Sequence, residues 1–142
     1  NMYELVSILR NCTYMVSSRY HAIVTSMPGL VASAGVTMDE RIRNLMADRG
    51  HQHLMLEVDD PSLGPRLVEV MRTLARDREQ VVAGIGRALP RQYQLMGQMG
   101  VDFLDEVVRV YPHFPRKDRP RTWDAHLPPL SPGIQTLLEQ HA

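Results

Sequence analysis

Short apolar runs alternate with amphipathic stretches in the first part of this chain, and this alternation limits its possible folds more than any other feature. Apolar β-formers at Tyr14–Val16, Leu30–Ala34 and His53–Val58 predict three short buried strands. A helical pattern at Tyr20–Met27 and another after Gly35 lie between them. Strands that are separated by helices run parallel, with right-handed crossovers. The sequence therefore predicts a doubly wound α/β fold, with a parallel sheet of few strands flanked by helices.

Local signals place the ends of the helices. The apolar spacing over Met2–Asn11 predicts a short amphipathic helix before the first strand. Thr37 is followed three residues later by Glu40, which is a capping-box signature for a helix that begins after Gly35 has ended the second strand. Gly50 follows the last turn of that helix, where a glycine cap is common.

The next part of the chain is predicted to be helical. The apolar spacing over residues 67–89 fits two helices or one kinked helix equally well, and Gly84 and Gly86 indicate close packing or a bend there. Residues Arg91–Tyr111 predict a further helix. Its Met-rich stripe is interpreted as core filling, because methionine adapts to irregular gaps.

Proline dominates the end of the chain. Six of the ten prolines lie between Pro112 and Pro132, which indicates an extended arm, and residues 134–140 predict a short terminal helix. The expected organisation is thus one domain over residues 1–111 and a Pro-rich arm over residues 112–142. The basic residues of the arm are Arg116, Lys117, Arg119 and Arg121.

The composition excludes several classes of function. Sixteen basic residues balance sixteen acidic ones, so no general electrostatic attraction to nucleic acid is expected. No apolar run approaches the roughly 20 residues that a membrane span needs. The single cysteine, Cys12, excludes an internal disulfide and is interpreted as a structural thiol. We expect a cytoplasmic protein.

Chemistry-bearing side chains gather directly after the first predicted strand. Ser17, Ser18, Arg19 and His21 supply two hydroxyls, a guanidinium and an imidazole. In open α/β sheets, ligands bind beyond the carboxyl ends of the strands. Such a set of donors suits a phosphate or a carboxylate. The sequence therefore predicts an anion-binding site at this edge.

The segment Met15–Val24 resembles the polysaccharide pyruvyl transferase family. In that family an Arg-x-His segment follows a buried strand, as Arg19 and His21 do here, and an Asp-x-basic pair follows the next strand, as Asp39 and Arg41 do. The likeness covers about Met2 to Arg87, and Arg41 stands where a lysine is common in the family.

The resemblance implies a fold and an activity. The fold would be two Rossmann-like domains facing each other across a cleft, as in GT-B glycosyltransferases, with this chain as most of the C-terminal domain. The activity would be transfer of pyruvate from phosphoenolpyruvate to a sugar of a polysaccharide as a ketal, in exopolysaccharide biosynthesis. The chain alone would be inactive without an N-terminal domain, and the reaction would need no cofactor.

The resemblance also implies residue roles. Arg19 would hold the phosphate or carboxylate of the donor, and His21 would be the acid-base residue. Asp39 and Arg41, with Ser17 and Ser18, would bind substrate. No metal site is expected, since His51 and His53 have no third ligand near them in the sequence.

Two other interpretations remain open. The first keeps the fold but changes the reaction, to a GT-B glycosyltransferase or epimerase-like domain that binds a nucleotide sugar. The second is a non-catalytic interaction domain, in which the Met-rich helix and the Pro-rich arm bind a partner or a second copy of this chain as a homo-oligomer.

Overall fold

The computed structural model describes residues 1–115 and 120–141, and the chain forms two compact units, Asn1–Ala88 and Leu89–Ala142. The predicted α/β class is confirmed, because the first unit contains a parallel three-stranded sheet with helices on both faces. Of the basic arm, residues 116–119 lie outside the described part of the chain.

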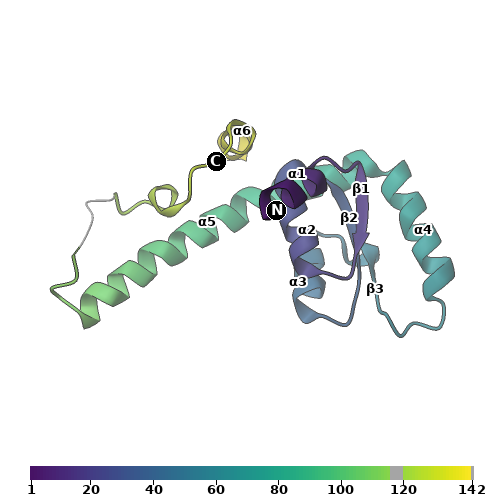
Figure 1. Ribbon diagram of the computed structural model, residues 1–142, viewed down its shortest axis with the longest axis horizontal. Helices are drawn as coiled ribbons and strands as arrows, with labels where there is room; N and C mark the ends of the chain where they lie inside the picture. Colours follow the sequence, from purple (N-terminus) through teal and green to yellow (C-terminus); the bar gives the residue numbers. More distant parts are fainter. Residues whose placement is uncertain (116–119, 142) are drawn as a thin grey trace. The chain divides into compact units, whose positions relative to one another are not determined.

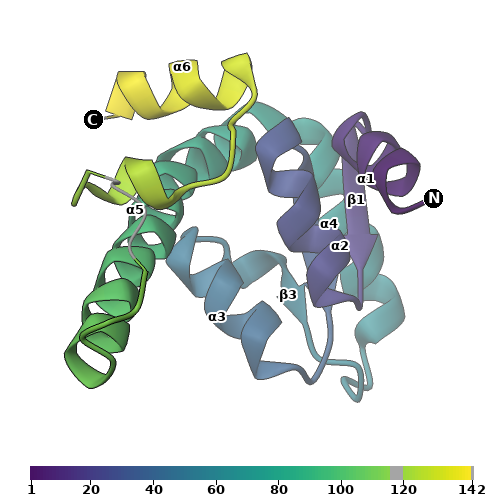
Figure 2. The same cartoon turned by 60° about the vertical axis from the view of Figure 1, so that its left-hand side comes forward.

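The sheet of the first unit has its strands in sequence order, β1-β2-β3, and all of them are parallel (Figure 1). Helices α2 and α3 form the crossovers and lie on one face of the sheet, while α4 packs on the other face (Figure 1 and Figure 2). Helix α1 packs against α2. The elements are α1 (Met2–Arg10), β1 (Tyr14–Ser17), α2 (Tyr20–Ser26), η1 (Met27–Gly29), β2 (Ala32–Val36), α3 (Glu40–Asp48), η2 (Gln52–Leu54), β3 (Met55–Leu56) and α4 (Leu63–Arg76).

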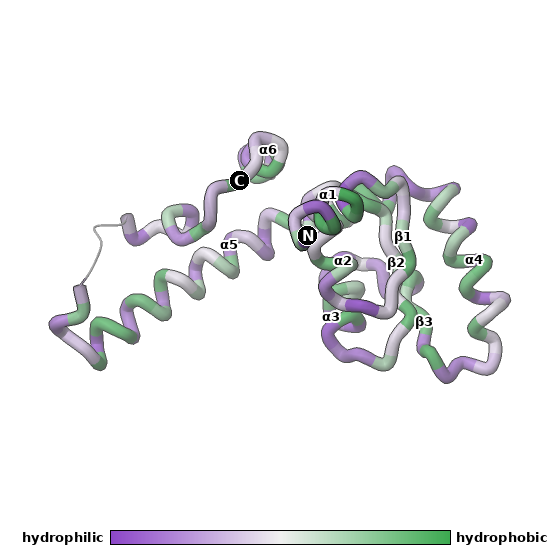
Figure 3. Tube along the Cα trace, viewed as in Figure 1, coloured by the Kyte–Doolittle hydropathy of each residue, from purple (hydrophilic) through white to green (hydrophobic). Residues whose placement is uncertain are grey.

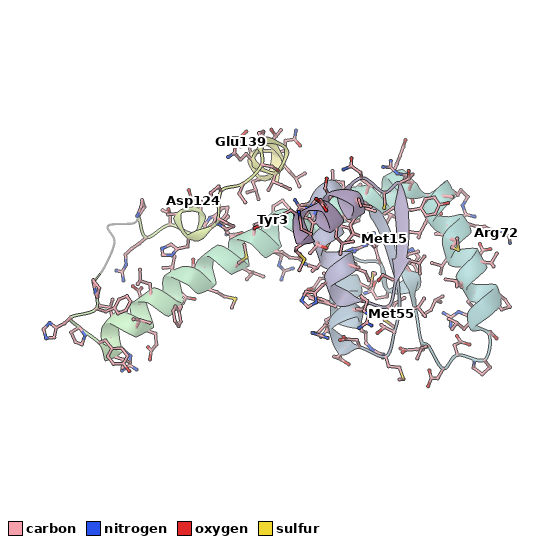
Figure 4. All side chains as sticks on the ribbon, viewed as in Figure 1. Tyr3, Met15, Met55, Arg72, Asp124 and Glu139 are labelled. Carbon is pink, nitrogen blue, oxygen red and sulfur yellow. The ribbon has the colours of Figure 1, made fainter. Side chains whose placement is uncertain are left out.

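Apolar side chains from both layers of helices bury the sheet. In Figure 3 the hydrophobic stretches of the strands run through the middle of this unit, and in Figure 4 the side chain of Arg72 on α4 points away from the sheet. Each fully buried aliphatic side chain contributes roughly 1.5–3 kcal/mol relative to exposure. The fully buried large side chains are Ile23, Met27, Val31, Ile42, Met46, Leu54, Leu56, Leu74 and Ile85.

Gly35 does not end the second strand, and that prediction is wrong. Strand β2 runs through Gly35 to Val36. A Cβ atom at position 35 would lie 2.6 Å from Cγ2 of Ile42 in α3. The absence of a side chain at Gly35 therefore lets α3 pack closely on β2. A glycine inside a strand also weakens that strand.

The third strand is much shorter than predicted. Only Met55–Leu56 pair with β2, whereas the sequence pattern extends over His53–Val58. The backbone before Met55 is held in a 3₁₀ turn, because the Leu54 N–H donates to the His51 carbonyl at 2.9 Å. The His51 N–H in turn donates to Met46 in α3 at 2.7 Å. Gly50 lies between them with φ of 71° and caps α3 as predicted.

A buried polar cluster joins the end of α3 to β2. Arg49 is only 4% exposed, and its Nη1 donates to the Ser33 hydroxyl at 3.1 Å. Burial lowers the pKa of Arg49 to about 10. The Nε of Arg49 donates to Nδ1 of His51 at 3.3 Å, and a Cβ at Gly84 would lie 2.5 Å from Nε2 of the same imidazole. The predicted close packing at Gly84 is thus confirmed, and its neighbour is His51.

Helix α5 (Arg78–Val110) is continuous, so the predicted separation of a helix at Arg91–Tyr111 from the preceding one is wrong. The single break in the helical region lies at Asp77, between α4 and α5. Pro90 is inside α5 and cannot donate a backbone hydrogen bond. Good helix formers on either side of Pro90 offset that loss.

The second unit consists of the larger part of α5 and the segment that returns along it. This segment contains η3 (Trp123–His126) and α6 (Pro132–His141), which confirms the predicted terminal helix. Gly97 and Gly100 of α5 allow its close approach, since a Cβ at Gly97 would collide with the carbonyl of Trp123 and one at Gly100 would lie 2.9 Å from Cβ of His126. The side chain of Arg121 pairs with Asp105.

The Met-rich stripe of α5 is not core, contrary to the sequence interpretation. Met99 is 70% exposed and Phe103 is 72% exposed, while Val101 on another side of the helix is buried. Hydrophobic and hydrophilic residues alternate along this part of α5 (Figure 3). Within the described residues, no helix has the length and apolar character that crossing a membrane requires.

Candidate functional site

The carboxyl ends of β1 and β2 lie next to each other, which places the two predicted motifs at one edge of the sheet. Ser17 is paired with Gly35 in the parallel register. The residues that follow, Ser18–His21 after β1 and Thr37–Arg41 after β2, therefore leave the sheet at the same edge, and α2 and α3 begin there. We call this the carboxyl-edge site.

The turn from β1 into α2 presents Arg19 to solvent. The Arg19 backbone N–H donates to Oγ of Ser17 at 3.0 Å, which closes a short local turn. Arg19 is the N-cap residue of α2, with extended backbone angles of φ −107° and ψ 117°. Its side chain is exposed, as is that of Ser18. The guanidinium of Arg19 has no hydrogen bond or ion pair to any residue that the structure describes.

His21 lies in the first turn of α2 and is also exposed. Its backbone carbonyl accepts from the Thr25 hydroxyl at 2.5 Å. The imidazole meets the ring of Tyr20 edge to face, with ring centroids 5.6 Å apart and planes at 77°. Neither imidazole nitrogen bonds to a described side chain.

The second motif is organised around Asp39. Thr37 is not the N-cap of α3, and the capping box predicted from Thr37 and Glu40 is wrong. The Thr37 hydroxyl accepts from the Asp39 N–H at 2.7 Å, and Asp39 itself caps the helix, since its Oδ1 accepts from the Arg41 N–H at 2.9 Å. A complete capping box does occur at α1, where Asn1 and Glu4 bond to each other's backbone.

Asp39 also holds the side chain of Arg41. The Arg41 Nε lies 3.1 Å from Oδ1 of Asp39, and Nη2 lies 2.6 Å from Oδ2. Hydrogen bonds from the Arg41 side chain and backbone lower the pKa of Asp39, so the carboxylate stays ionised. The Asp39 carboxylate thus accepts hydrogen bonds from both the backbone N–H and the side chain of Arg41.

Tyr20 connects the two motifs. The guanidinium carbon of Arg41 lies 5.3 Å from the centroid of the Tyr20 ring, which is a cation–π contact between the start of α2 and the start of α3. Sequence reasoning did not assign a role to Tyr20. The signal that could have found it is an aromatic residue between Arg19 and His21, at a position where its ring can reach the next crossover helix.

Two acidic residues that follow the third strand, Glu57 and Asp60, both have partners. Glu57, directly after β3, pairs with Arg43 of α3 at 2.8 Å. Asp60 is bonded by the Ser62 N–H and by Arg66, and these bonds lower the pKa of its carboxyl. Among the described residues, the Arg19 guanidinium and the nitrogens of the His21 imidazole have no hydrogen-bond or ion-pair partner. The arrangement is suited to an anion.

Among the side chains that the structure describes, those of residues 1–115 and 120–140, no group of three or more His, Cys, Asp or Glu could hold a metal ion. His51 and His53 meet edge to face with centroids 6.1 Å apart, but His51 is buried and bonded to Arg49. Cys12 is half-buried, and its thiol donates to the Ile8 carbonyl at 3.4 Å.

Comparison of the chain with protein-family models, with curated proteins and with solved structures finds no match.

Proposed function

We propose that the chain is the donor-binding domain of a polysaccharide pyruvyl transferase. The observation that carries this proposal is the shared edge at which Arg19 and His21 follow β1 and Asp39 and Arg41 follow β2, joined through Tyr20. The spacing of both motifs resembles that family, and the three parallel strands with crossover helices are compatible with a Rossmann-like domain.

The residue types match the chemistry. Phosphoenolpyruvate carries a phosphate and a carboxylate, and Arg19 has a free guanidinium that can grip either in two places. His21 gives a proton to the methylene carbon of the enol, which makes the neighbouring carbon electrophilic. A sugar hydroxyl adds there, the bond to the phosphate oxygen breaks, and a second hydroxyl closes the ketal. Of the two protons that the hydroxyls lose, one returns to His21 and one leaves with phosphate.

Arg19 and His21 are both exposed to solvent in this chain, so the proposed reaction needs a second domain to cover them. A proton transfer of this kind requires a site from which bulk water is excluded. In the proposed enzyme a second, GT-B-like domain outside this chain closes over the carboxyl-edge site and brings the sugar acceptor. The isolated chain is then inactive. The use of phosphoenolpyruvate as the pyruvate donor and the presence of a single cysteine are consistent with a cytoplasmic location.

The test uses the full-length protein with phosphoenolpyruvate and a panel of hexose and N-acetylhexosamine glycosides, and measures release of inorganic phosphate. Turnover is expected in the wild type and a fall of at least about a hundredfold in His21→Ala, the usual range for loss of a general acid. His53→Ala is the matched control, because His53 is also exposed but lies away from this edge. Undiminished turnover in His21→Ala would reject the role of His21.

A binding measurement separates the rival interpretations. Thermal shift with phosphoenolpyruvate and with uridine diphosphate sugars compares the two donors on the same protein. Stabilisation by the nucleotide sugar alone would favour the glycosyltransferase or epimerase-like alternative. Binding of neither, together with a stable dimer in light scattering, would favour the interaction domain.

A further inference from the structure

We propose that Tyr20 is a positioning residue of the carboxyl-edge site, and that its ring fixes the Arg41 guanidinium and the His21 imidazole relative to each other. This inference rests on the proposed function, and it assigns a role to a position that the Arg-x-His motif leaves unspecified. It also gives the two residues of the second motif different roles: Arg41 contacts the ligand, and Asp39 holds the Arg41 side chain in place.

The ring of Tyr20 has both neighbours within contact range. The Arg41 guanidinium carbon lies 5.3 Å from the ring centroid, and the His21 ring lies 5.6 Å from it at a steep angle. Tyr20 is half-buried at the first position of α2, so the helix restricts its side-chain torsions. A half-buried aromatic ring loses little further freedom when a ligand binds, which makes it a suitable platform for two mobile polar groups.

Asp39 fixes Arg41 from the other side. Its carboxylate takes the Nε and Nη2 donors, the latter at 2.6 Å. The Nη1 nitrogen has no hydrogen-bond acceptor among the described residues, and a guanidinium has five N–H donors in all. Three N–H donors therefore remain on Arg41, two on Nη1 and one on Nη2. The Asp39 carboxylate along one edge of the guanidinium and the Tyr20 ring against one face hold them in direction.

These contacts predict which arginine binds each anionic group of a ligand that carries two of them. Arg19 is unpaired and binds one of them, and the Nη1 side of Arg41 binds the other. Asp39 cannot serve as a direct ligand contact, because its carboxylate would repel an anion and is already occupied. The class of ligand is thus a small molecule with two negative groups, as phosphoenolpyruvate is.

The first experiment measures binding of phosphoenolpyruvate to the full-length protein by calorimetry. Tyr20→Leu removes the ring and is expected to weaken binding about two- to fivefold, the size of an exposed cation–π contact. Tyr20→Phe keeps the ring and is expected to bind like the wild type. Combining Tyr20→Leu with Arg41→Ala is expected to weaken binding no further than Arg41→Ala alone. Tyr3→Leu on α1 is the matched control, since Tyr3 is 86% exposed.

The second experiment needs no ligand. With ¹⁵N-labelled arginine, the Nε–H signal of Arg41 is assigned by its loss in Arg41→Lys. The Tyr20 ring current and the bond to Asp39 are expected to displace this signal from those of exposed arginines. Tyr20→Leu should move it toward the exposed position, while Tyr20→Phe and Tyr3→Leu should leave it unchanged. Circular dichroism confirms that each variant is folded.

The two experiments separate the two proposals. Displacement of the Arg41 signal and weaker binding in Tyr20→Leu support both. If the wild type binds phosphoenolpyruvate but Tyr20→Leu changes neither signal nor affinity, the role of Tyr20 is rejected while the proposed function stands. If the wild type does not bind phosphoenolpyruvate at millimolar concentration, the proposed function is rejected, and the Arg41 signal alone decides whether Tyr20 orders this side chain.

Discussion

Arg49 is buried against Ser33 of β2, with Nη1 3.1 Å from the serine hydroxyl and Nη2 3.2 Å from the serine carbonyl. The Nε–H of Arg49 donates to Nδ1 of His51 at 3.3 Å, so this imidazole accepts a hydrogen bond and is neutral. A buried cation beside a neutral histidine makes the stability of the first unit depend on pH.

Stability is expected to fall as the pH drops from 7 to 5. Burial, and then the charge of Arg49, lower the pKa of His51 to about 4. The unfolded chain therefore binds more protons than the folded one between pH 4 and about 6.5, and stability is lost as the pH falls through that window. His51→Asn keeps an acceptor near the Nδ1 position but does not titrate. Chemical unfolding followed by circular dichroism should show that the wild type loses roughly 1–2 kcal/mol more than His51→Asn. His113→Asn, at an exposed histidine of the second unit, should retain the wild-type loss.

Gly35→Ala is expected to destabilise the first unit. The new Cβ would lie 2.6 Å from Cγ2 of Ile42, and overpacking of this kind costs about 1–3 kcal/mol. Gly64→Ala is the matched control, because no atom lies within 4 Å of a Cβ there. Chemical unfolding measures both variants. In the Ile42→Ala background the cost of Gly35→Ala should shrink, and an unchanged cost would show that the contact with Ile42 is not its cause.

Gly97→Ala is expected to displace the returning segment of the second unit. A Cβ there would collide with the backbone of Trp123, which is the single tryptophan of the chain. The fluorescence of Trp123 therefore reports the change directly, and its emission should shift to the red. The matched control is Gly133→Ala at the start of α6, where a Cβ meets nothing within 4 Å. A wild-type spectrum for Gly97→Ala would contradict the packing seen here.

Removing the charge of Asp39 is expected to lower the stability of the chain less than removing its helix-capping oxygen as well. Asp39→Asn keeps an oxygen that can accept from the Arg41 N–H, whereas Asp39→Ala loses the cap and the ion pair together. The melting temperature should fall by about 5 °C in Asp39→Ala and by less in Asp39→Asn. Equal losses in the two variants would mean that the ion pair with Arg41, not the cap, holds the start of α3.

The elements near the site were predictable because their sequence signals are local. The β-formers before Ser17 and the small residues before Thr37 fix two parallel strands, and parallel strands place their following loops at one edge. This is why the two segments that bear Arg19 and Asp39 could be expected to lie together. Whether they bind phosphoenolpyruvate stays a prediction.

Features that depend on distant contacts were not predictable. Gly35 has the sequence signature of a strand end, but its role is set by Ile42 seven residues later. The Met-rich stripe of α5 has the spacing of a buried face, and periodicity does not show whether another element covers it. Tyr20 gains its place in the site only because α3 brings Arg41 over its ring.

The position of Pro90 within α5 has a consequence for how melting curves are read. The boundary between the compact units falls after Ala88, and the carbonyl of Gly86 receives no amide proton from position 90. The hydrogen-bond ladder of α5 is therefore interrupted close to that boundary. Denaturation of this chain has two reporters, since Trp123 belongs to one unit and the sheet to the other, and a midpoint from one should be assigned to its own unit alone.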